Sequence, residues 1–290
     1  MRKLVWLNGE LCALEEAKTS VADHAHLYGD GIFEGIRIYD GKVFKLDEHL
    51  DRLYHGIRML GYQMPQTQEE LRGIIRDVCA KAAIPSGYIR LNVTRGTGLG
   101  LDPKHIDPRC NVMVMVSTLA LYPPEAYANG LDVITTSVRV IPADSLDPRL
   151  KCIGRYASNI LAKMEANARG AGEGLMLNHQ GHIAECTGDN LFVVQGRRIR
   201  TPHPACGILK GITRDTVMSL ARAKGFEVTE DILTPFDVFS ADEAFLTGTA
   251  AEVIPMVSLD GKQIGTGRPG PVTQELMAAY KAETGKGTAF

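Results

Sequence analysis

The 290-residue sequence has almost no net charge, few cysteines and no long apolar run. Lysine and arginine number 32 against 34 aspartates and glutamates, so the formal charge is −2. A nearly neutral protein has no overall field to hold DNA, RNA or an anionic membrane, and any anion must be bound by a local site. Hydrophobic residues make up 44% and charged residues 23%, which is typical of a globular protein rather than a disordered chain.

Signals for secretion and for membrane insertion are missing as well. The short basic start is not followed by the apolar core of a signal peptide. The most apolar stretch, residues 112–122, is far shorter than the ~20 residues that span a bilayer. The six cysteines show no Cys-x-x-Cys spacing, and disulfide-stapled secreted domains are usually smaller and richer in cysteine. We therefore expect a cytoplasmic protein with reduced thiols and no membrane partner.

Familiar nucleotide, metal and hydrolase motifs are also absent. The glycine clusters at 96–100 and 170–174 lack both the G-x-G-x-x-G order and a following GK[ST]. His24 and His26 could share the face of a strand, but no acidic residue or cysteine lies at metal-ligand spacing from them. No G-x-S-x-G elbow occurs. We expect neither a metal ion nor a bound nucleotide.

Short apolar runs alternate with helical patterns, and up to about residue 120 they predict an α+β domain with mostly antiparallel strands. Asn8-Gly9 and Asp40-Gly41 are hairpin turns between apolar runs. Apolar residues at steps of 4, 3, 4 and 3 predict a helix over 46–60 that Gly61 closes. Thr67 and Glu70 form a capping box before a second helix. Residues 88–95 and 111–121 are expected to be long buried strands.

Residues 122–130 are rich in turn formers and lack periodicity, which predicts an interdomain loop. The expected domains are a small N-terminal α+β domain over 1–121 and a large C-terminal cofactor-binding domain over 131–290. In the latter, hairpins again outnumber strand–helix–strand crossovers, which argues against a doubly wound parallel sheet. Helices are expected at 158–168, from Thr213 through 223, and at 271–281.

Two loops in the second half have the chemistry of an anion site. Gly211-Ile212-Thr213 precedes a predicted helix, whose free N–H groups and dipole favour an anion. Gly248-Thr249-Ala250 follows a predicted strand and offers a hydroxyl beside a glycine. A plain helix cap and a plain turn are the alternatives. By residue type alone, Lys151 would be an ordinary solvated surface lysine, and Glu185 would be an unremarkable charge at the end of a strand.

Six segments, in this order, strongly resemble the class IV (fold type IV) pyridoxal-phosphate aminotransferases, and within them the branched-chain amino acid aminotransferases. They are HLYGDGIFEGIRIYDGKVFKLDEHLDRL, YIRLNVTRGTGLGLDP, LKCIGRYASNILAKMEA, IAECTGDNLFVV, GILKGITRD and LTGTAAEVIP. The resemblance runs from about residue 4 to 260. It implies an α/β (α+β) two-domain fold, like that of D-amino acid aminotransferase, with pyridoxal 5'-phosphate between the domains.

The resemblance also implies roles for the cofactor residues. Lys151 matches the catalytic lysine that bonds to the cofactor aldehyde and later shuttles the substrate α-proton. Glu185 matches the carboxylate that faces the pyridine nitrogen and favours its protonated form. Tyr156 matches the tyrosine that binds the phenolic oxygen. The expected phosphate contacts are Arg52, Ile212, Thr213 and Thr249. This favours the anion-site interpretation of both loops.

Substrate residues are implied in the same way. Tyr88 and Arg90 match the branched-chain signature Tyr-Ile-Arg, in which the arginine can take the far carboxylate of glutamate. The matching side-chain pocket consists of Phe33, Gly35 and Arg37, and the α-carboxylate contacts are Thr249 and Ala250. Tyr28 and Tyr122 match tyrosines that a neighbouring subunit lends to the pocket, which implies a homodimer or higher homo-oligomer.

The expected reaction is amino transfer from L-leucine, L-isoleucine or L-valine to 2-oxoglutarate. The family pattern is broken at Leu91, Arg155, Cys186 and Asp189, the last replacing a common glutamate. A D-amino acid aminotransferase usually carries Arg-x-His after Thr-Arg-Gly, where this chain has Gly98-Leu99-Gly100. An (R)-amine transaminase and an aminodeoxychorismate lyase are further alternatives that do not typically show Tyr-Ile-Arg. A non-catalytic cofactor-binding protein is disfavoured by Lys151, Glu185 and Arg52 together.

Overall fold

The computed structural model describes residues 4–290, which divide into two compact units. Unit 1 contains the chain up to residue 119 together with 151–155 and 284–290, and unit 2 contains 120–150 and 156–283. The two short segments of unit 1 lie within the predicted C-terminal domain. The predicted domain limits stay a prediction, and residues 1–3 lie outside the described residues.

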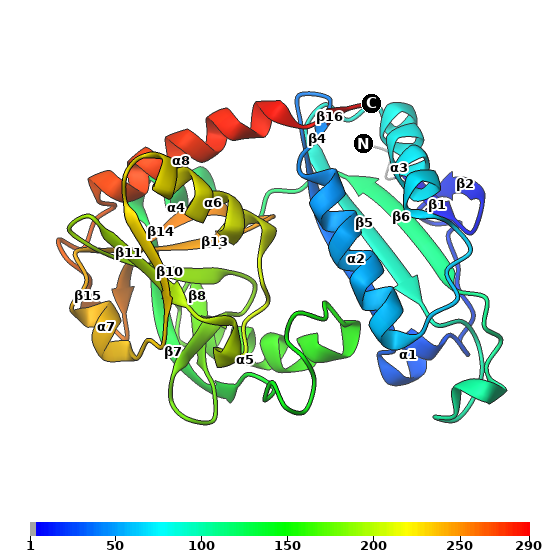
Figure 1. The fold of residues 1–290 in the computed structure, drawn as a ribbon, viewed down its shortest axis with the longest axis horizontal. Coiled ribbons are helices and arrows are strands. Elements are labelled where there is room, and N and C mark those ends of the chain that lie inside the picture. Colours follow the sequence, from blue (N-terminus) through cyan, green and yellow to red (C-terminus); the bar gives the residue numbers. More distant parts are fainter. Residues whose placement is uncertain (1–3) are drawn as a thin grey trace. The chain divides into compact units, whose positions relative to one another are not determined.

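Unit 1 is built on a seven-stranded sheet in the order β16-β4-β3-β5-β6-β1-β2 (Figure 1). Every pair in it is antiparallel, as the turn signals predict. The strands are β1 (Leu4–Leu7), β2 (Glu10–Ala13), β3 (Gly31–Tyr39), β4 (Lys42–Val43), β5 (Gly87–Thr94), β6 (Asn111–Ser117) and β16 (Thr288–Ala289). The strand predicted over 111–121 therefore ends four residues early, at Ser117.

Two helices, α2 (Leu46–Leu60) and α3 (Gln68–Ala82), pack on one face of this sheet. The predicted helix over 46–60 and its closure by Gly61 in the left-handed conformation are confirmed. The capping box of Thr67 and Glu70 is confirmed too. Burial of the helices' apolar stripes against the β-branched residues of β3, β5 and β6 makes the core of unit 1. Unit 1 also holds α1 (His24–Tyr28), η1 (Pro103–His105), η2 (Ile153–Arg155) and η4 (Thr284–Lys286).

Unit 2 is built on a mixed nine-stranded sheet in the order β12-β11-β10-β13-β14-β7-β8-β9, with β15 beside β14 (Figure 1). Its strands are β7 (Leu131–Arg139), β8 (Glu173–Leu177), β9 (Ile183–Cys186), β10 (Asn190–Gln195), β11 (Arg198–Pro202), β12 (Glu227–Asp231), β13 (Glu243–Gly248), β14 (Glu252–Leu259) and β15 (Lys262–Gln263). Three of its pairs are parallel, so this unit is less uniformly antiparallel than its hairpins suggest. The helical elements are α4 (Pro124–Asn129), α5 (Tyr156–Ala168), η3 (Pro204–Cys206), α6 (Ile212–Ala223), α7 (Pro235–Phe239) and α8 (Pro271–Glu283).

Three local predictions were wrong. The segment 122–130 is not a plain loop but contains α4, because Pro124 has the fixed φ that suits the first turn of a helix. Gly211, not Thr213, is the N-cap of α6, so Thr213 lies inside the first turn. His24 and His26 lie on α1 rather than on a strand, because Asp23 caps this short helix.

No helix among residues 4–290 is long and apolar enough to cross a membrane.

Candidate active site

One face of the unit 1 sheet carries all five residues predicted to line the side-chain pocket and the Tyr-Ile-Arg signature. In the register of β3 and β5, Phe33 faces Asn92, Gly35 faces Arg90 and Arg37 faces Tyr88. Since side chains alternate along a strand, these residues project from the same side. The Arg90 guanidinium carbon lies 3.5 Å from the centroid of the Phe33 ring, and Arg90 Nε donates to Asn92 Oδ1 at 2.8 Å. A cation is thus held against an apolar wall.

Two methionines on this face were not predicted. Met113 and Met115 on β6 stand opposite Asn92 and Arg90, and both are half-buried. The signal that could have predicted them is the spacing of two residues between the methionines in a predicted strand, which places both side chains on one face.

Gly35 lies directly beneath the phenol of Tyr88, so a Cβ there would overlap the phenol oxygen. We expect Gly35→Ala to displace Tyr88 and lower kcat/KM for L-leucine, the substrate type that the resemblance implies, roughly ten- to a hundredfold, the range for a misfit of one methyl group. Steady-state kinetics measures this loss. Gly73→Ala is the matched control, because nothing lies within 4 Å of a Cβ at Gly73 on α3. Unchanged kinetics for Gly35→Ala would show that this face of the sheet does not line the substrate pocket.

The opposite face of β3 carries a buried ionic group among aliphatic residues. Glu34 is fully buried and accepts hydrogen bonds from Arg52 Nε and Nη2, both at 2.7 Å. Nδ1 of the buried His49 lies 2.7 Å from Glu34 Oε2. Burial by itself raises the pKa of Glu34, but the charge and hydrogen bonds of Arg52, with those of His49, lower it to about 2. Glu34 and His49 were not predicted as site residues, and they fix the orientation of the predicted phosphate arginine.

Burial of His49 acts in the other direction. It lowers the pKa of the imidazole, the hydrogen bond and charge of Glu34 raise it, and the charges of Arg52 and Lys151 lower it, so that this pKa lies below its ordinary value. The charge of the triad formed by Glu34, His49 and Arg52 is therefore carried by the carboxylate and the guanidinium.

Lys151 belongs to a short segment that pairs with the start of β3. Phe33 N donates to the Lys151 carbonyl at 3.1 Å, and Cys152 forms an antiparallel bridge with Ile32. β4 pairs only with residues 38 and 39 of β3, so this part of the strand edge is open to the segment. Lys151 Nζ lies 4.6 Å from the centroid of the Phe33 ring, the same ring that Arg90 covers. The predicted catalytic lysine and the predicted pocket therefore meet within unit 1.

A close approach between two glycines holds this segment in place. Gly154 N donates to the Gly29 carbonyl at 3.1 Å, and a Cβ on Gly29 would lie 2.7 Å from Gly154 Cα. Gly29 has φ +70°, the left-handed conformation that glycine adopts without strain. Cys152 Sγ also donates to the Gly29 carbonyl, at 3.6 Å. Only glycine at position 29 lets the lysine segment come this close.

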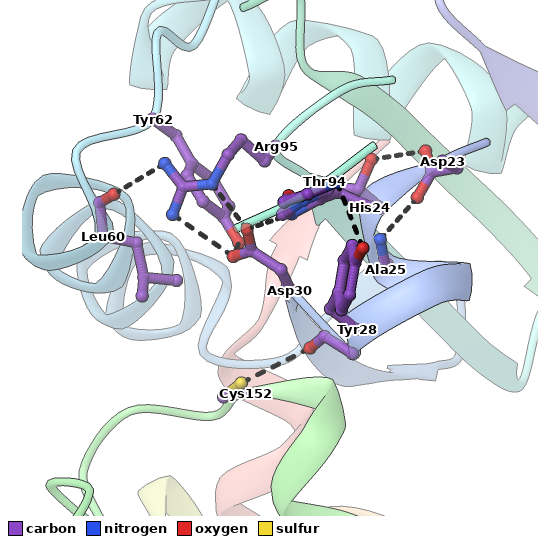
Figure 2. Close-up of polar contacts among 12 residues, drawn as sticks. Asp23, His24, Ala25, Tyr28, Asp30, Leu60, Tyr62, Thr94, Arg95 and Cys152 are labelled. Atoms are coloured by element: carbon purple, nitrogen blue, oxygen red, sulfur yellow. Dashed lines mark hydrogen bonds and ion pairs between the residues drawn. The ribbon is translucent and has the colours of Figure 1, made fainter. Parts of the chain in front are cut away.

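Next to Gly29, a cluster of polar side chains fixes the link between α1 and β3 (Figure 2). Asp30 accepts hydrogen bonds from Arg95 and from the Tyr62 hydroxyl, and His24 Nδ1 lies 2.7 Å from it. Burial alone raises the pKa of Asp30, but these hydrogen bonds keep it below its ordinary value. The Tyr28 hydroxyl accepts from Gly100 N at 3.1 Å, and Tyr28 remains 45% exposed. Its predicted contact with a neighbouring subunit stays a prediction.

The predicted cofactor residues of unit 2 gather around the turn between β9 and β10. Glu185 Oε2 accepts from Asn190 Nδ2 at 3.1 Å and from Leu209 N at 2.9 Å. Asn190 Nδ2 also donates to the Leu209 carbonyl at 2.9 Å, which ties the turn to the loop before α6. Gly211 lies so close to the Asn190 side chain that a Cβ there would overlap its Oδ1. Glu185 and the N-terminus of α6 are therefore neighbours.

The second predicted anion loop lies at the same turn. A Cβ on Gly248, at the end of β13, would overlap Oδ1 of Asp189. On α6 the Gly211 N-cap provides no side-chain hydrogen bond, so the first-turn N–H groups of Ile212 and Thr213 are not capped by it. Asn159 Nδ2, one turn after Tyr156 on α5, donates to the Thr187 carbonyl at 2.8 Å. Unit 2 thus brings Glu185 together with both loops and with α5.

Tyr122, predicted to reach the pocket of a neighbouring subunit, has polar partners within its own unit. Its hydroxyl donates to Glu173 Oε2 at 3.1 Å and lies 3.5 Å from Asp189 Oδ2. Its ring packs against the apolar core of unit 2. The predicted substrate contact stays a prediction, and the two buried carboxyls beneath Tyr122 are unpredicted neighbours of the Glu185 turn.

Unit 1 thus holds a lysine at the edge of a strand, and unit 2 holds a carboxylate beside the N-terminus of α6. The family model for amino-transferase class IV matches residues 31–259, and the chain belongs to that family.

Within the family, the chain is similar to branched-chain amino acid aminotransferases. It is 43% identical to the putative branched-chain-amino-acid aminotransferase of Methanocaldococcus jannaschii, over 96% of this chain and 95% of the relative. The crystal structure of the Escherichia coli branched-chain amino acid aminotransferase matches with a TM-score of 0.93 and 35% identity, over 99% of this chain and 95% of that one. The branched-chain amino acid aminotransferase of Thermobaculum terrenum, solved in its PLP-form (holo-form), matches with a TM-score of 0.87 and 30% identity, over 98% of this chain and 95% of that one.

Proposed function

We propose that this chain transfers the amino group of L-leucine, L-isoleucine or L-valine to 2-oxoglutarate, with pyridoxal 5'-phosphate as cofactor. The observation that carries the proposal is Arg90 lying on the Phe33 ring, with Lys151 Nζ on the same ring. This face offers an apolar wall for a branched side chain and a guanidinium for the far carboxylate of glutamate. A transaminase needs both, because the two half-reactions place an apolar and an acidic side chain in one pocket.

The residues present fit a phosphorylated pyridine cofactor. The uncapped N-terminus of α6 suits a phosphate, and Arg52, oriented by Glu34, is the matching guanidinium. Glu185 is a buried carboxylate held by two donors, which suits a protonated ring nitrogen. We assign the phosphate to Arg52, Ile212, Thr213 and Thr249, and the phenolic oxygen to Tyr156.

The cofactor, when bound, supplies an electron-accepting ring that stabilises negative charge at the substrate α-carbon. Lys151, whose neutral amine is the reactive form, would hold the cofactor through its aldehyde and, once released from it, would take the proton from the substrate α-carbon and return it. Glu185 would face the ring nitrogen and favour its protonated form. The backbone at Thr249 and Ala250 holds the substrate α-carboxylate.

We also propose that the protein is a cytoplasmic homodimer or higher homo-oligomer. The support is an exposed apolar group on unit 1, with Leu99 74% and Leu101 77% exposed on either side of Gly100, which binds Tyr28. Large apolar side chains that are exposed close together in the chain are candidates for an interface.

Single-turnover spectroscopy tests the substrate assignment. We expect the absorbance of the bound pyridoxal form to convert to that of the pyridoxamine form rapidly with L-leucine, and at least about a hundredfold more slowly with D-alanine or (R)-1-phenylethylamine. The stated ratio corresponds to about 3 kcal/mol of discrimination. Rapid conversion only by D-alanine or the amine would establish the rival activities instead. Absence of pyridoxal absorbance after cofactor addition would contradict the proposal altogether.

A further inference from the structure

A single tyrosine hydroxyl lies against two buried carboxyl groups in unit 2. Tyr122 Oη is 3.1 Å from Glu173 Oε2 and 3.5 Å from Asp189 Oδ2, and Glu173 and Asp189 are 3% and 5% exposed. A tyrosine hydroxyl has one proton, so it can donate to only one of the two carboxyls. The other must be satisfied in a different way, because a buried carboxylate without donors is costly.

Glu173 is the carboxyl that the surrounding donors serve. Its Oε1 accepts from Thr187 Oγ1 and from Gly174 N, both at 2.6 Å. Its Oε2 accepts from Tyr122, and Lys163 Nζ lies 3.5 Å away. Three donors and a nearby ammonium match an ionised carboxylate.

Asp189 has no comparable set of donors. Among the residues that the structure describes, the Tyr122 hydroxyl is the only polar partner of its side chain, at the long distance of 3.5 Å. The other carboxyl oxygen, Oδ1, lies where a Cβ on Gly248 would be, so it faces a residue without a side-chain donor. With the tyrosine proton directed to Glu173, the remaining arrangement is an Asp189 hydroxyl that donates to the Tyr122 oxygen.

We propose that Asp189 is a positioning residue that, below neutral pH, carries its own proton, donates a hydrogen bond to the Tyr122 oxygen, and keeps the turn beside Glu185 free of a further negative charge. The turn is short: Cys186 N donates to the Asp189 carbonyl at 2.8 Å, and the next residue, Asn190, binds Glu185. The charge and position of Asp189 therefore act directly on the residue that holds Glu185. The effect on Glu185 deepens the proposed function and rests on it.

The groups that face Asp189 determine the pH at which its proton is lost. Burial raises the pKa of Asp189 most, the charges of Glu173 and Glu185 raise it further, and Lys163 and the Tyr122 hydrogen bond lower it, to about 7 overall. The fully buried Cys186 is itself held well above its ordinary pKa, so it stays a neutral thiol. Near neutral pH, ionisation of Asp189 adds a negative charge next to Glu185 and strengthens the hold on the proton that Glu185 shares with the cofactor ring.

Infrared difference spectroscopy of the holoenzyme tests the proton directly. The wild-type minus Asp189→Asn spectrum should show a protonated carboxyl stretch at pH 5.5 that disappears with a midpoint near pH 7. Tyr122→Phe should move this band to higher wavenumber, because the acid loses its hydrogen-bond acceptor. A carboxylate band at every pH, or a band unaffected by Tyr122→Phe, would overturn the proposal.

The link to Glu185 is tested through the absorbance of the bound cofactor as a function of pH. We expect a spectral step near pH 7 in the wild type that Asp189→Asn abolishes, since asparagine mimics the neutral acid at every pH. Asp144→Asn is the matched control, an exposed aspartate of the same unit, and should retain the step. Persistence of the step in Asp189→Asn would show that Asp189 does not act on Glu185. A protein that binds no pyridoxal 5'-phosphate would refute the proposed function, while the same infrared measurement on the cofactor-free protein would still decide whether Asp189 holds a proton.

Discussion

Replacement of Lys151 by alanine is expected to abolish amino transfer, with kcat reduced by at least about a thousandfold. The neutral amine has two proposed tasks, bonding to the cofactor aldehyde and moving the α-proton, and alanine can do neither. Positioned proton transfer alone is worth roughly 10²- to 10⁴-fold. Single-turnover absorbance with L-leucine measures the loss, and the same spectra report whether pyridoxal 5'-phosphate still binds without the covalent bond.

Two controls separate chemistry from charge. Lys151→Arg keeps the positive charge next to Phe33 but cannot supply a neutral amine, so it should be as inactive as the alanine variant. Lys81→Ala makes the same change at an exposed position of α3 and should retain full activity. Substantial turnover by Lys151→Ala would show that another group moves the α-proton.

Features encoded by neighbouring residues were predictable. The Asn8-Gly9 hairpin, the helix over 46–60 and the capping box of Thr67 and Glu70 each depend on residues a few positions apart, and the structure has all three. The class IV motifs point to Lys151 and Glu185, whose residue types alone are uninformative, and the roles of these two residues stay predictions. The short helices α1 and α4 were missed because five or six residues show no periodicity.

Features that depend on tertiary contacts were not predictable from the patterns used. Glu34 on β3 binds His49 and Arg52 on α2, which follow it by 15 and 18 residues, and no local motif predicts these contacts. A signal did exist: Glu34 occupies a buried register position between Ile32 and Ile36, where a charge needs a partner. His49 and Arg52, one turn apart, lie on the buried side of α2. Asp189 was recognised as a departure from the family, but its hydrogen-bond partner Tyr122 and the neighbouring Glu173 come from distant parts of the chain.

Glu34→Gln is expected to destabilise the protein by roughly 3–5 kcal/mol, the usual effect of removing one partner from a buried ion pair. The amide keeps the shape of the side chain but leaves the Arg52 guanidinium without its counter-charge. Urea unfolding of the apo form at pH 7 measures the loss. Glu48→Gln is the matched control on α2, because Glu48 is exposed and its ion pair with Lys45 lies at the surface, where ion pairs contribute little.

The pH dependence of this difference has a defined sign. The pKa of Glu34 falls from an ordinary 4.5 to about 2 on folding, so its ionisation stabilises the protein above about pH 4.5. That contribution is lost as the pH falls through the folded-state pKa. The wild type should therefore lose its advantage over Glu34→Gln progressively below about pH 5. A difference that stayed constant down to pH 3 would show that Glu34 is not held as a carboxylate by Arg52.

The same variant tests whether the triad also serves the cofactor. Pyridoxal 5'-phosphate stabilises the folded protein by an amount that grows with its affinity for that state. If Glu34 orients Arg52 toward the phosphate, a fixed excess of cofactor should raise the unfolding free energy of Glu34→Gln less than that of the wild type and of Glu48→Gln. Equal stabilisation of all three proteins would show that Glu34 stabilises the core of unit 1 but does not affect cofactor binding. A smaller gain in Glu34→Gln alone would mean that one buried carboxylate both stabilises the α2–β3 contact and aligns the guanidinium that binds the phosphate.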